Sequence, residues 1–220
     1  LFASRSDRQQ RLEFMAANPK RKYTLEEYFE LELSTNERFE YWNGEVFSMS
    51  GVSEEHDQIE GNAYLNLRLA LRDRQCRVFL ANMRIKVPSL PPYRYGDVSV
   101  ACAEPIFEKI GGVDVLTNPT LIIEVLSDST EAYDRGDKFT HYKSIPSLLG
   151  YVLIAQHRPH ITHYERNPDG SWGYSEINEI SASVFLKSID CTLELTEIYR
   201  NVTFPAKPLP NLREPGDAVQ

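Results

Sequence analysis

Two short segments of the chain are apolar along nearly their whole length, and a polar segment joins them. The first, residues 120–126, is TLIIEVL, and the second, residues 150–155, is GYVLIA. Such runs are typical of strands that are buried on both faces of a sheet. The polar segment from about residue 131 to residue 144 predicts a helix, which Pro146 stops. A strand, a crossover helix and a second strand form a βαβ unit, so we expect the two strands to be parallel.

Capping residues and periodicity predict two helices nearer the N-terminus. Thr24 and Glu27 have the spacing of a capping box, which opens a short helix. Ser53 is positioned to cap a longer helix, whose apolar residues recur every fourth position. These apolar residues are Ile59, Ala63, Leu67 and Leu71.

Turn residues divide the remaining chain into short strands. Asn43-Gly44, between FEYW and EVFSM, predicts a hairpin, and residues 167–170 (NPDG) predict another between residues 160–166 and 171–177. Strands are expected in residues 76–87 and 97–102, whereas Gly111-Gly112 suggests a plain loop. The resulting order of helix, three strands, helix and strand indicates an α/β fold.

Composition indicates an ordinary globular chain. The 220 residues carry a net charge of −8, and no apolar run approaches the roughly 18 residues that span a bilayer. We expect one domain at residues 21–204, with tails at 1–20 and 205–220 and no membrane partner. The cysteines are odd in number and far apart, which argues against a disulfide framework and for a reducing, cytoplasmic location. They are Cys76, Cys102 and Cys191.

Two carboxylates occupy unusual positions in the predicted sheet. Glu124 lies inside a buried strand, where a charge is costly unless something compensates it, and Asp97 opens a neighbouring strand. One explanation is that Glu124 pairs with a buried arginine and Asp97 merely begins its strand. The other is that the two carboxylates meet at one edge of the sheet and bind a hard cation such as Mg²⁺, which prefers oxygen ligands and accepts substrate phosphates.

Lys138 is the candidate cation beside these carboxylates. A βα connection brings the first turns of the following helix near the end of the Glu124 strand, and Tyr142, four residues later, shares the helix face of Lys138. The alternative is a solvated lysine that pairs with Asp134 at the same spacing.

Together these residues resemble the restriction-endonuclease-like, or PD-(D/E)xK, superfamily, and more closely its Uma-two family of predicted endonucleases, abundant in cyanobacteria. The resemblance covers about residues 22–200 and is most specific between residues 118 and 153. It implies the superfamily core of helix, three strands, helix and strand, here with an N-terminal helix and hairpin and a C-terminal hairpin. The matching positions are residues 39–46 (FEYWNGEV), His56, residues 93–98 (YRYGDV), residues 118–127 (NPTLIIEVLS), Thr130, Asp134, Lys138, Tyr142 and residues 145–147 (IPS).

The chain departs from the superfamily pattern at two positions. Gly96 stands where the family usually has proline, so Asp97 is expected to be less rigidly held. The lysine of the Glu-x-Lys motif would fall at Leu126, and the related family lacks it there too. Lys138 is the expected replacement, with Lys86 as the second candidate.

Four further residues are candidate neighbours of the site. The resemblance implies that either Glu40 or Glu45 faces the cleft, although both could be exposed hairpin charges. His56, in the first turn of the longer helix, could contact phosphate or carry a proton, but a surface position is the commoner outcome. Arg84 could anchor Glu124 or contact phosphate.

A zinc site is a further hypothesis. His157, His160 and His163 lie close in sequence, but the odd spacing places His160 and His163 on opposite faces of a strand. No Cys-x-x-Cys pair accompanies them, which makes zinc the weaker hypothesis.

The sequence therefore predicts a metal-dependent endonuclease acting on DNA, in which Asp97 and Glu124 bind Mg²⁺ or Mn²⁺ and Lys138 stabilises the transition state. A homodimer would supply the two sites that cutting both strands commonly needs. The alternative is a non-catalytic nucleic-acid-binding or regulatory module that retains the fold. The acidic net charge and the displaced lysine favour the alternative, whereas the Asp97–Glu124 pair favours the enzyme.

Overall fold

The computed structural model describes residues 21–35, 38–42, 44–49, 51–88, 93–128 and 130–204. The predicted tails lie outside these residues. The helices are α2 (Leu25–Ser34), α3 (Glu54–Ala70), α4 (Glu131–Tyr133), α5 (Phe139–Tyr142) and α6 (Leu195–Ile198), with a π-helical turn at Asp134–Lys138 and a 3-10 turn at Lys187–Ile189. The strands are β1 (Phe39–Trp42), β2 (Glu45–Ser48), β3 (Cys76–Leu80), β4 (Arg84–Lys86), β5 (Tyr93–Tyr95), β6 (Val98–Cys102), β7 (Phe107–Ile110), β8 (Val113–Leu116), β9 (Leu121–Leu126), β10 (Gly150–Ala155), β11 (Ile161–Arg166), β12 (Trp172–Ile177), β13 (Ser183–Leu186) and β14 (Cys191–Glu194).

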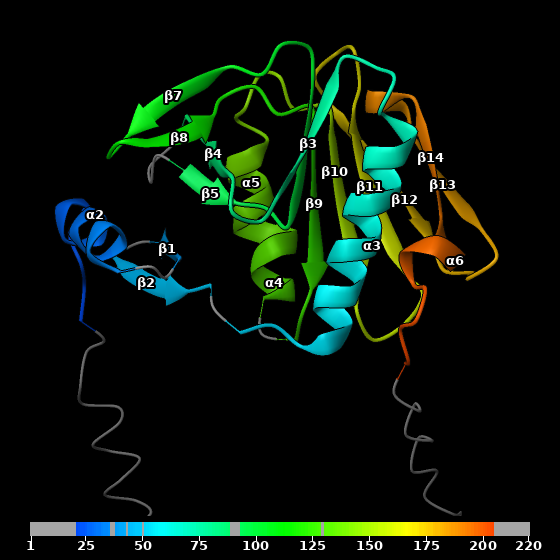
Figure 1. Ribbon diagram of the computed structural model, residues 1–220, viewed down its shortest axis with the longest axis horizontal. Coiled ribbons are helices and arrows are strands. Elements are labelled where there is room, and N and C mark those ends of the chain that lie inside the picture. Colours follow the sequence, from blue (N-terminus) through cyan, green and yellow to red (C-terminus); the bar gives the residue numbers. More distant parts are fainter. Residues whose placement is uncertain are drawn as a thin grey trace, which may run out of the picture.

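A six-stranded mixed sheet forms the centre of the molecule, in the order β12-β11-β10-β9-β6-β3 (Figure 1). β9 and β10 are parallel and are joined by the α4–α5 segment, so the predicted βαβ unit is confirmed. The other strand pairs of this sheet are antiparallel. Every residue of β9 and β10 is buried, as their apolar sequences require.

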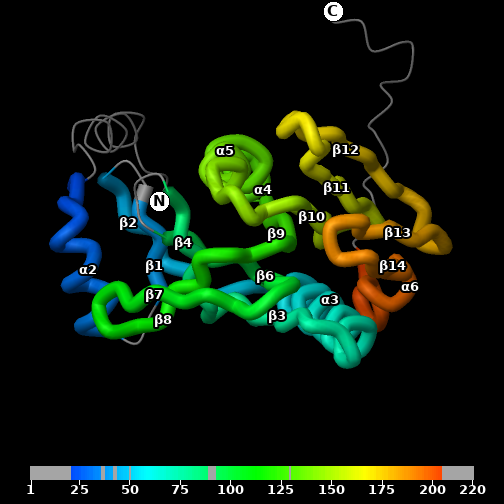
Figure 2. The backbone as a smooth tube through the Cα atoms, turned by 90° about the horizontal axis from the view of Figure 1, so that it is seen from above, coloured from blue at the N-terminus to red at the C-terminus, as the bar shows by residue number. Residues whose placement is uncertain are grey.

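Helices cover both faces of this sheet, as the view from above shows (Figure 2). On one face, α3 packs with α6, β13 and β14, and its predicted apolar stripe lies fully in the core. On the other face, the α4–α5 segment packs against β9 and β10. Consecutive residues of β9 therefore alternate between two separate apolar clusters.

The predicted local signals are present. The Thr24 side chain accepts the Glu27 N–H and the Glu27 carboxylate accepts the Thr24 N–H, which completes the capping box of α2. Ser53 caps α3 by accepting the N–H of His56. The hairpins β1–β2 and β11–β12 form as expected. Gly44, in the first of these turns, has a φ of +81°, a conformation that favours glycine.

Gly111-Gly112 is not a plain loop but the turn of the β7–β8 hairpin, with φ angles of +60° and +81°. Positive φ at both central residues is the requirement of the tight type I′ hairpin turn, which glycine pairs satisfy well. The hairpin belongs to a second sheet, ordered β5-β4-β8-β7, which the sequence did not predict. The pair β13–β14 was also not anticipated.

The expectation of no disulfide is wrong. Cys76 and Cys102 are bonded to each other, and Cys191 is free and buried. The two bonded residues lie 26 positions apart in sequence but directly opposite one another in the antiparallel pair β3–β6. Sheet register brings them together, and their sequence spacing gave no sign of it.

Among the described residues, no helix combines the length and apolar character needed to cross a membrane.

Candidate active site

Glu124 is held inside the sheet by its neighbours on β9. Ile123 and Val125 point into the cluster beneath α3, whereas Ile122 and Leu126 point toward the α4–α5 segment. Alternation along a strand places the Glu124 side chain on this second side, where it is only 2% exposed. The buried charge predicted from the sequence therefore needs a partner on the α4–α5 face.

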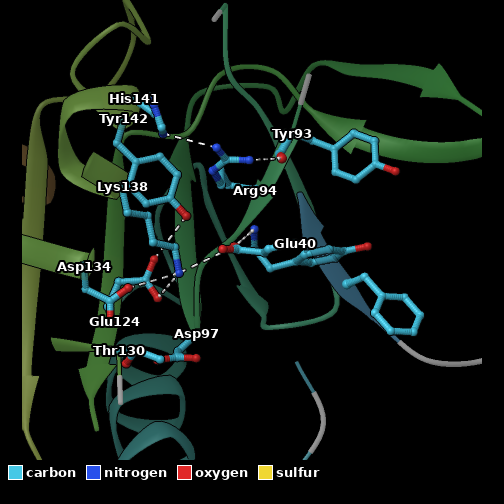
Figure 3. Close-up of polar contacts among 12 residues, drawn as sticks. Glu40, Tyr93, Arg94, Asp97, Glu124, Thr130, Asp134, Lys138, His141 and Tyr142 are labelled. Atoms are coloured by element: carbon cyan, nitrogen blue, oxygen red, sulfur yellow. Dashed lines mark hydrogen bonds and ion pairs between the residues drawn. The ribbon is translucent and has the colours of Figure 1, made fainter. Parts of the chain in front are cut away.

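Lys138 supplies that partner. Among the described residues, no arginine pairs with Glu124. Lys138 Nζ lies 3.0 Å from Glu124 Oε2, 3.4 Å from Asp134 Oδ1 and 3.6 Å from Glu40 Oε1 (Figure 3). Lys138 is 3% exposed, so the alternative of a solvated lysine paired only with Asp134 is wrong, although that pair is present within the larger cluster.

The helix that carries Lys138 is irregular at this point. Residues Asp134–Lys138 form a single π-helical turn between α4 and α5. The sequence predicted a regular helix here, because capping and periodicity give no warning of a π turn. Such turns are uncommon and occur often at functional sites. Here Asp134 begins the turn and Lys138 ends it, and both are buried and paired.

Tyr142 completes the contacts of Glu124. Its hydroxyl donates to Glu124 Oε1 at 3.1 Å, so the two carboxylate oxygens have different partners. The aromatic ring of Tyr142 is fully buried in the apolar cluster between α5 and strands β9 and β10. Tyr142 thereby fixes the orientation of the carboxylate.

The charge balance of the cluster shifts the pKa values of its members. Burial raises the pKa of Glu124 well above its usual range, and the charges of Asp97, Asp134 and Glu40 add to this effect, while Lys138 opposes it. Burial alone would lower the pKa of Lys138, but the charges of Glu124, Glu40 and Asp134 outweigh it and raise that pKa. Lys138 thus remains a cation, and the surplus of carboxylates favours uptake of a proton or a second cation.

Asp97 lies just beyond the last ladder pair of β6 and β9. Val98 pairs with Ile123 in that antiparallel register, so the next position sets Asp97 opposite Glu124. Asp97 Oδ2 accepts the N–H of Val125 at 2.6 Å and takes the place of a backbone acceptor just before β6 begins.

Gly96 permits this close approach. A Cβ atom at position 96 would lie 2.8 Å from Ile122 Cγ2 and 3.5 Å from Glu124 Oε1. Glycine lets the segment between β5 and β6 approach β9 closely, and the N–H of Val125 donates to the Asp97 carboxylate. The expected lower rigidity of Asp97 stays a prediction. The close packing explains why a bulkier residue does not suit this position in this chain.

His56 and Glu60 face Asp97 from α3. His56 is 7% exposed, so the expected surface position is wrong, and its Nε2 lies 3.4 Å from Asp97 Oδ2. Burial opposes protonation of His56, but Asp97 outweighs burial and raises the pKa of the imidazole. Burial and the charge of Asp97 raise the pKa of Glu60 to about 7, with His56 opposing. Glu60 is not among the residues predicted from the sequence, although its place four residues after His56 on one helix is a usable signal.

The remaining candidates divide between the site and other contacts. Glu40 is buried and faces Lys138, whereas Glu45 pairs with Lys22 at the protein surface. Arg84 neither anchors Glu124 nor lies among the cleft residues; it forms a buried ion pair with Glu32. Lys86 pairs with Glu108 outside the cluster.

The three histidines of the zinc hypothesis have separate partners in the described part of the chain. His157 pairs with Asp128 at 2.8 Å, and His160 contacts Asn178 and Thr162. His163 is buried within β11 opposite Val152. These contacts do not bring the imidazoles to one point.

Asp97, Glu124, Asp134 and Lys138 line one cleft of about 500 Å³ between α3 and the end of β9. Its polar lining includes His56, Glu60, Asp97, Glu124, Asp134 and Lys138. An acidic, partly enclosed cleft with one buried lysine is suited to hold a cation and to bind a substrate that carries negative charge.

The sheet, the two covering helical segments and the Asp97–Glu124–Lys138 cluster define a restriction-endonuclease-like protein. Its fold matches a crystal structure from Anabaena variabilis, described as a putative nuclease belonging to DUF820, with a TM-score of 0.63 and 19% identity over 80% of this chain and 97% of that one. The profile of the Uma2 family, described as "Putative restriction endonuclease", matches residues 25–196, and the chain belongs to that family.

Two relatives come from Synechocystis sp., and both carry the description "uncharacterized protein". One, sll1609, is 35% identical over 73% of this chain and 90% of its own length. The other, slr1290, is 34% identical over 83% of this chain and 94% of its own length. The resemblance stated from the sequence is thus confirmed at the level of family and fold.

Proposed function

We propose that the protein is a metal-dependent endonuclease that hydrolyses phosphodiester bonds of DNA. The observation that carries the proposal is the placement of Asp97 opposite Glu124 on neighbouring strands, in one cleft, with the Lys138 ammonium 3.0 Å from Glu124. An aspartate, a strand glutamate and a lysine are the functional set of the family's superfamily, here with the lysine supplied by the π-helical turn.

The donor set fits a divalent cation. Three carboxylates lie within 3.6 Å of Lys138 Nζ, and Asp97 and Glu60 are further acids in the cleft lining. Oxygen ligands and surplus negative charge favour Mg²⁺ or Mn²⁺ at Asp97 and Glu124. Such an ion supplies Lewis-acid stabilisation of the phosphoryl oxygens and a more acidic bound water.

The side chains of the chain itself then have separate tasks. Tyr142 orients one oxygen of Glu124, and the N–H of Val125 fixes Asp97. Lys138 retains its proton and presents a compact positive charge beside the carboxylates, where negative charge develops on the phosphoryl group. Arginine at position 138 would be a poor replacement, because its planar guanidinium needs a different shape of site.

Substrate binding is expected to depend on the cation, because the protein carries a net charge of −8. An acidic protein lacks the broad basic surface that drives non-specific DNA binding. Cutting both strands would favour a homodimer with two sites. Because Cys76 and Cys102 form a disulfide, the cysteines no longer indicate a reducing compartment. The proposed cytoplasmic location therefore rests on the proposed DNA substrate alone.

A nicking assay on supercoiled plasmid, with Mg²⁺, Mn²⁺ or a chelator, tests the proposal. The wild type should nick only with metal, and Asp97→Asn and Glu124→Gln should abolish the activity. Lys138→Met should lower the rate by about 10²–10³, as expected on removal of a transition-state donor. Lys86→Met, which lies outside the cluster, should cleave like the wild type. Absence of nicking in every metal, from a folded wild type, would refute the proposal.

The second candidate is a non-catalytic module that retains the fold and binds nucleic acid or a regulatory partner. The deep burial of Lys138 favours it, because an ammonium already committed to three carboxylates has little access to substrate. Metal-dependent DNA binding without nicking would support this candidate.

A further inference from the structure

We infer that His56, Glu60 and Asp97 form a site for a first-row transition metal ion, with Mn²⁺ preferred over Mg²⁺. The inference deepens the proposed function and rests on it for the role of Asp97 as a ligand. It adds two ligands from α3, neither of which belongs to the Asp97–Glu124–Lys138 set.

The three residues converge from two separate elements. His56 and Glu60 are four apart in α3, so their side chains lie on one face of the helix. Asp97 approaches them from the segment between β5 and β6, and its own carboxylate is fixed by the N–H of Val125. All three line the same cleft.

Their ligand atoms are close enough for a shared ion. One atom from each residue can be chosen such that all three lie within 4.8 Å of one another. With bonds of about 2.1 Å, adjacent ligands of one octahedral ion are about 3 Å apart and opposite ligands about 4.2 Å apart, so the three side chains need to close together around the ion. Glu60 is only partly buried, whereas His56 is buried, so the Glu60 side chain has the greater freedom to make that movement.

His56 Nε2 is the atom that points to a ligand. The residue is more than nine-tenths buried, and within the described residues its Nε2 makes no hydrogen bond of good geometry; its polar neighbour there is Asp97 Oδ2, 3.4 Å away. Buried polar atoms are nearly always paired, and an exception calls for an unrecorded partner such as an ion. A metal ion between Nε2, Glu60 and Asp97 would satisfy this nitrogen and both carboxylates.

The nitrogen ligand also selects among ions. Mg²⁺ takes oxygen ligands almost entirely and keeps a rigid octahedral geometry. Imidazole is a good ligand for first-row transition ions. Carboxylates bind both Mn²⁺ and Mg²⁺. One imidazole with two carboxylates is therefore better matched to Mn²⁺, and the open side of the cleft leaves positions for water or a phosphate oxygen.

The test is a Mn²⁺ titration of the chelator-stripped full-length protein, with free Mn²⁺ followed by electron paramagnetic resonance and Mg²⁺ as competitor. Wild type should bind Mn²⁺ more tightly than Mg²⁺. His56→Gln should weaken Mn²⁺ binding about tenfold or more and change Mg²⁺ binding far less. His157→Gln is the matched control, because that imidazole pairs with Asp128 outside the cluster, and it should bind Mn²⁺ like the wild type.

A second measurement avoids a substitution in the core. In NMR spectra of wild type loaded with Co²⁺, the paramagnetic ion should strongly shift the imidazole resonances of one histidine. The same shifted resonances should be present in the His157→Gln variant. Normal Mn²⁺ affinity in a folded His56→Gln variant would overturn the inference, as would Co²⁺ spectra without a shifted imidazole. If His56→Gln does not fold, the Co²⁺ spectra decide.

The two proposals can fail separately. Mn²⁺ binding through His56 without plasmid nicking would retain the site and refute the nuclease. Metal-dependent nicking with Mn²⁺ binding that is independent of His56 would retain the nuclease and refute this ligand set.

Discussion

Lys138 Nζ lies 3.0 Å from Glu124 Oε2, and both residues are at most 3% exposed. Within the described part of the chain, this lysine is the cation that Glu124, Asp134 and Glu40 share. Loss of one partner from a buried ionic cluster costs far more than loss of a surface pair, because the remaining charges stay desolvated.

Replacement of Lys138 by methionine should therefore destabilise the fold by about 3–5 kcal/mol at neutral pH. Glu124, Asp134 and Glu40 would be left together without a cation. The loss should shrink as pH falls, because burial raises the pKa values of Glu124 and Asp134 and these two carboxylates become protonated. Urea denaturation at several pH values measures the effect.

Lys86→Met is the matched control, because Lys86 forms a half-exposed pair with Glu108. It should cost less than about 1 kcal/mol. Equal losses for the two variants would contradict the buried cluster.

Gly96→Ala should destabilise the protein by about 1–3 kcal/mol, as overpacking of a close-packed site typically does. The new methyl group would meet Ile122 at 2.8 Å and press the strand away from Glu124. Gly61→Ala, inside α3 with no atom within 4 Å of its new Cβ, should instead stabilise by up to about 1 kcal/mol. Thermal and urea unfolding of the two variants should therefore shift in opposite directions.

Glu60→Gln should alter how stability depends on pH. Burial raises the pKa of Glu60 to about 7 from the ordinary 4.5, so the folded state binds the proton more tightly than the unfolded state. The cost of ionising the group in the fold therefore appears as pH rises from 4.5 through 7 and is complete above that. In metal-free protein the glutamine variant should melt at a higher temperature than the wild type at pH 8, and the difference should shrink toward pH 4.5. A constant difference across this range would show that Glu60 titrates normally.

The disulfide between Cys76 and Cys102 should stabilise the oxidised protein by about 3 kcal/mol, because it closes a loop with a sequence separation of 26 residues and restricts the unfolded chain. Unfolding in urea with and without reductant measures the difference. The Cys76→Ser/Cys102→Ser double variant should match the reduced wild type and lose the response to reductant. Alkylation of the denatured, unreduced wild type should label one thiol per chain, that of Cys191; three labelled thiols would contradict the bond.

The sequence by itself determined the framework of the fold. The apolar runs of β9 and β10, the stripe of α3 and the capping residues Thr24 and Ser53 are local signals, and each element formed where its pattern indicated. Glu124 stood out because a charge in such a run is costly wherever the strand is placed. The spacing of the βαβ unit also brought Lys138 into consideration, since a helix that follows a strand returns across the same sheet.

Only the tertiary structure decided how these residues meet. The π-helical turn sets the direction of Lys138, the β6–β9 register sets Asp97 opposite Glu124, and the packing of α3 against the sheet turns His56 inward and brings Glu60 beside Asp97. The β3–β6 register joins Cys76 to Cys102, and the close approach of Ile122 excludes a side chain at position 96. Periodicity and capping are properties of a few consecutive residues, whereas these contacts depend on distances between segments far apart in sequence, which are set only when the whole core packs.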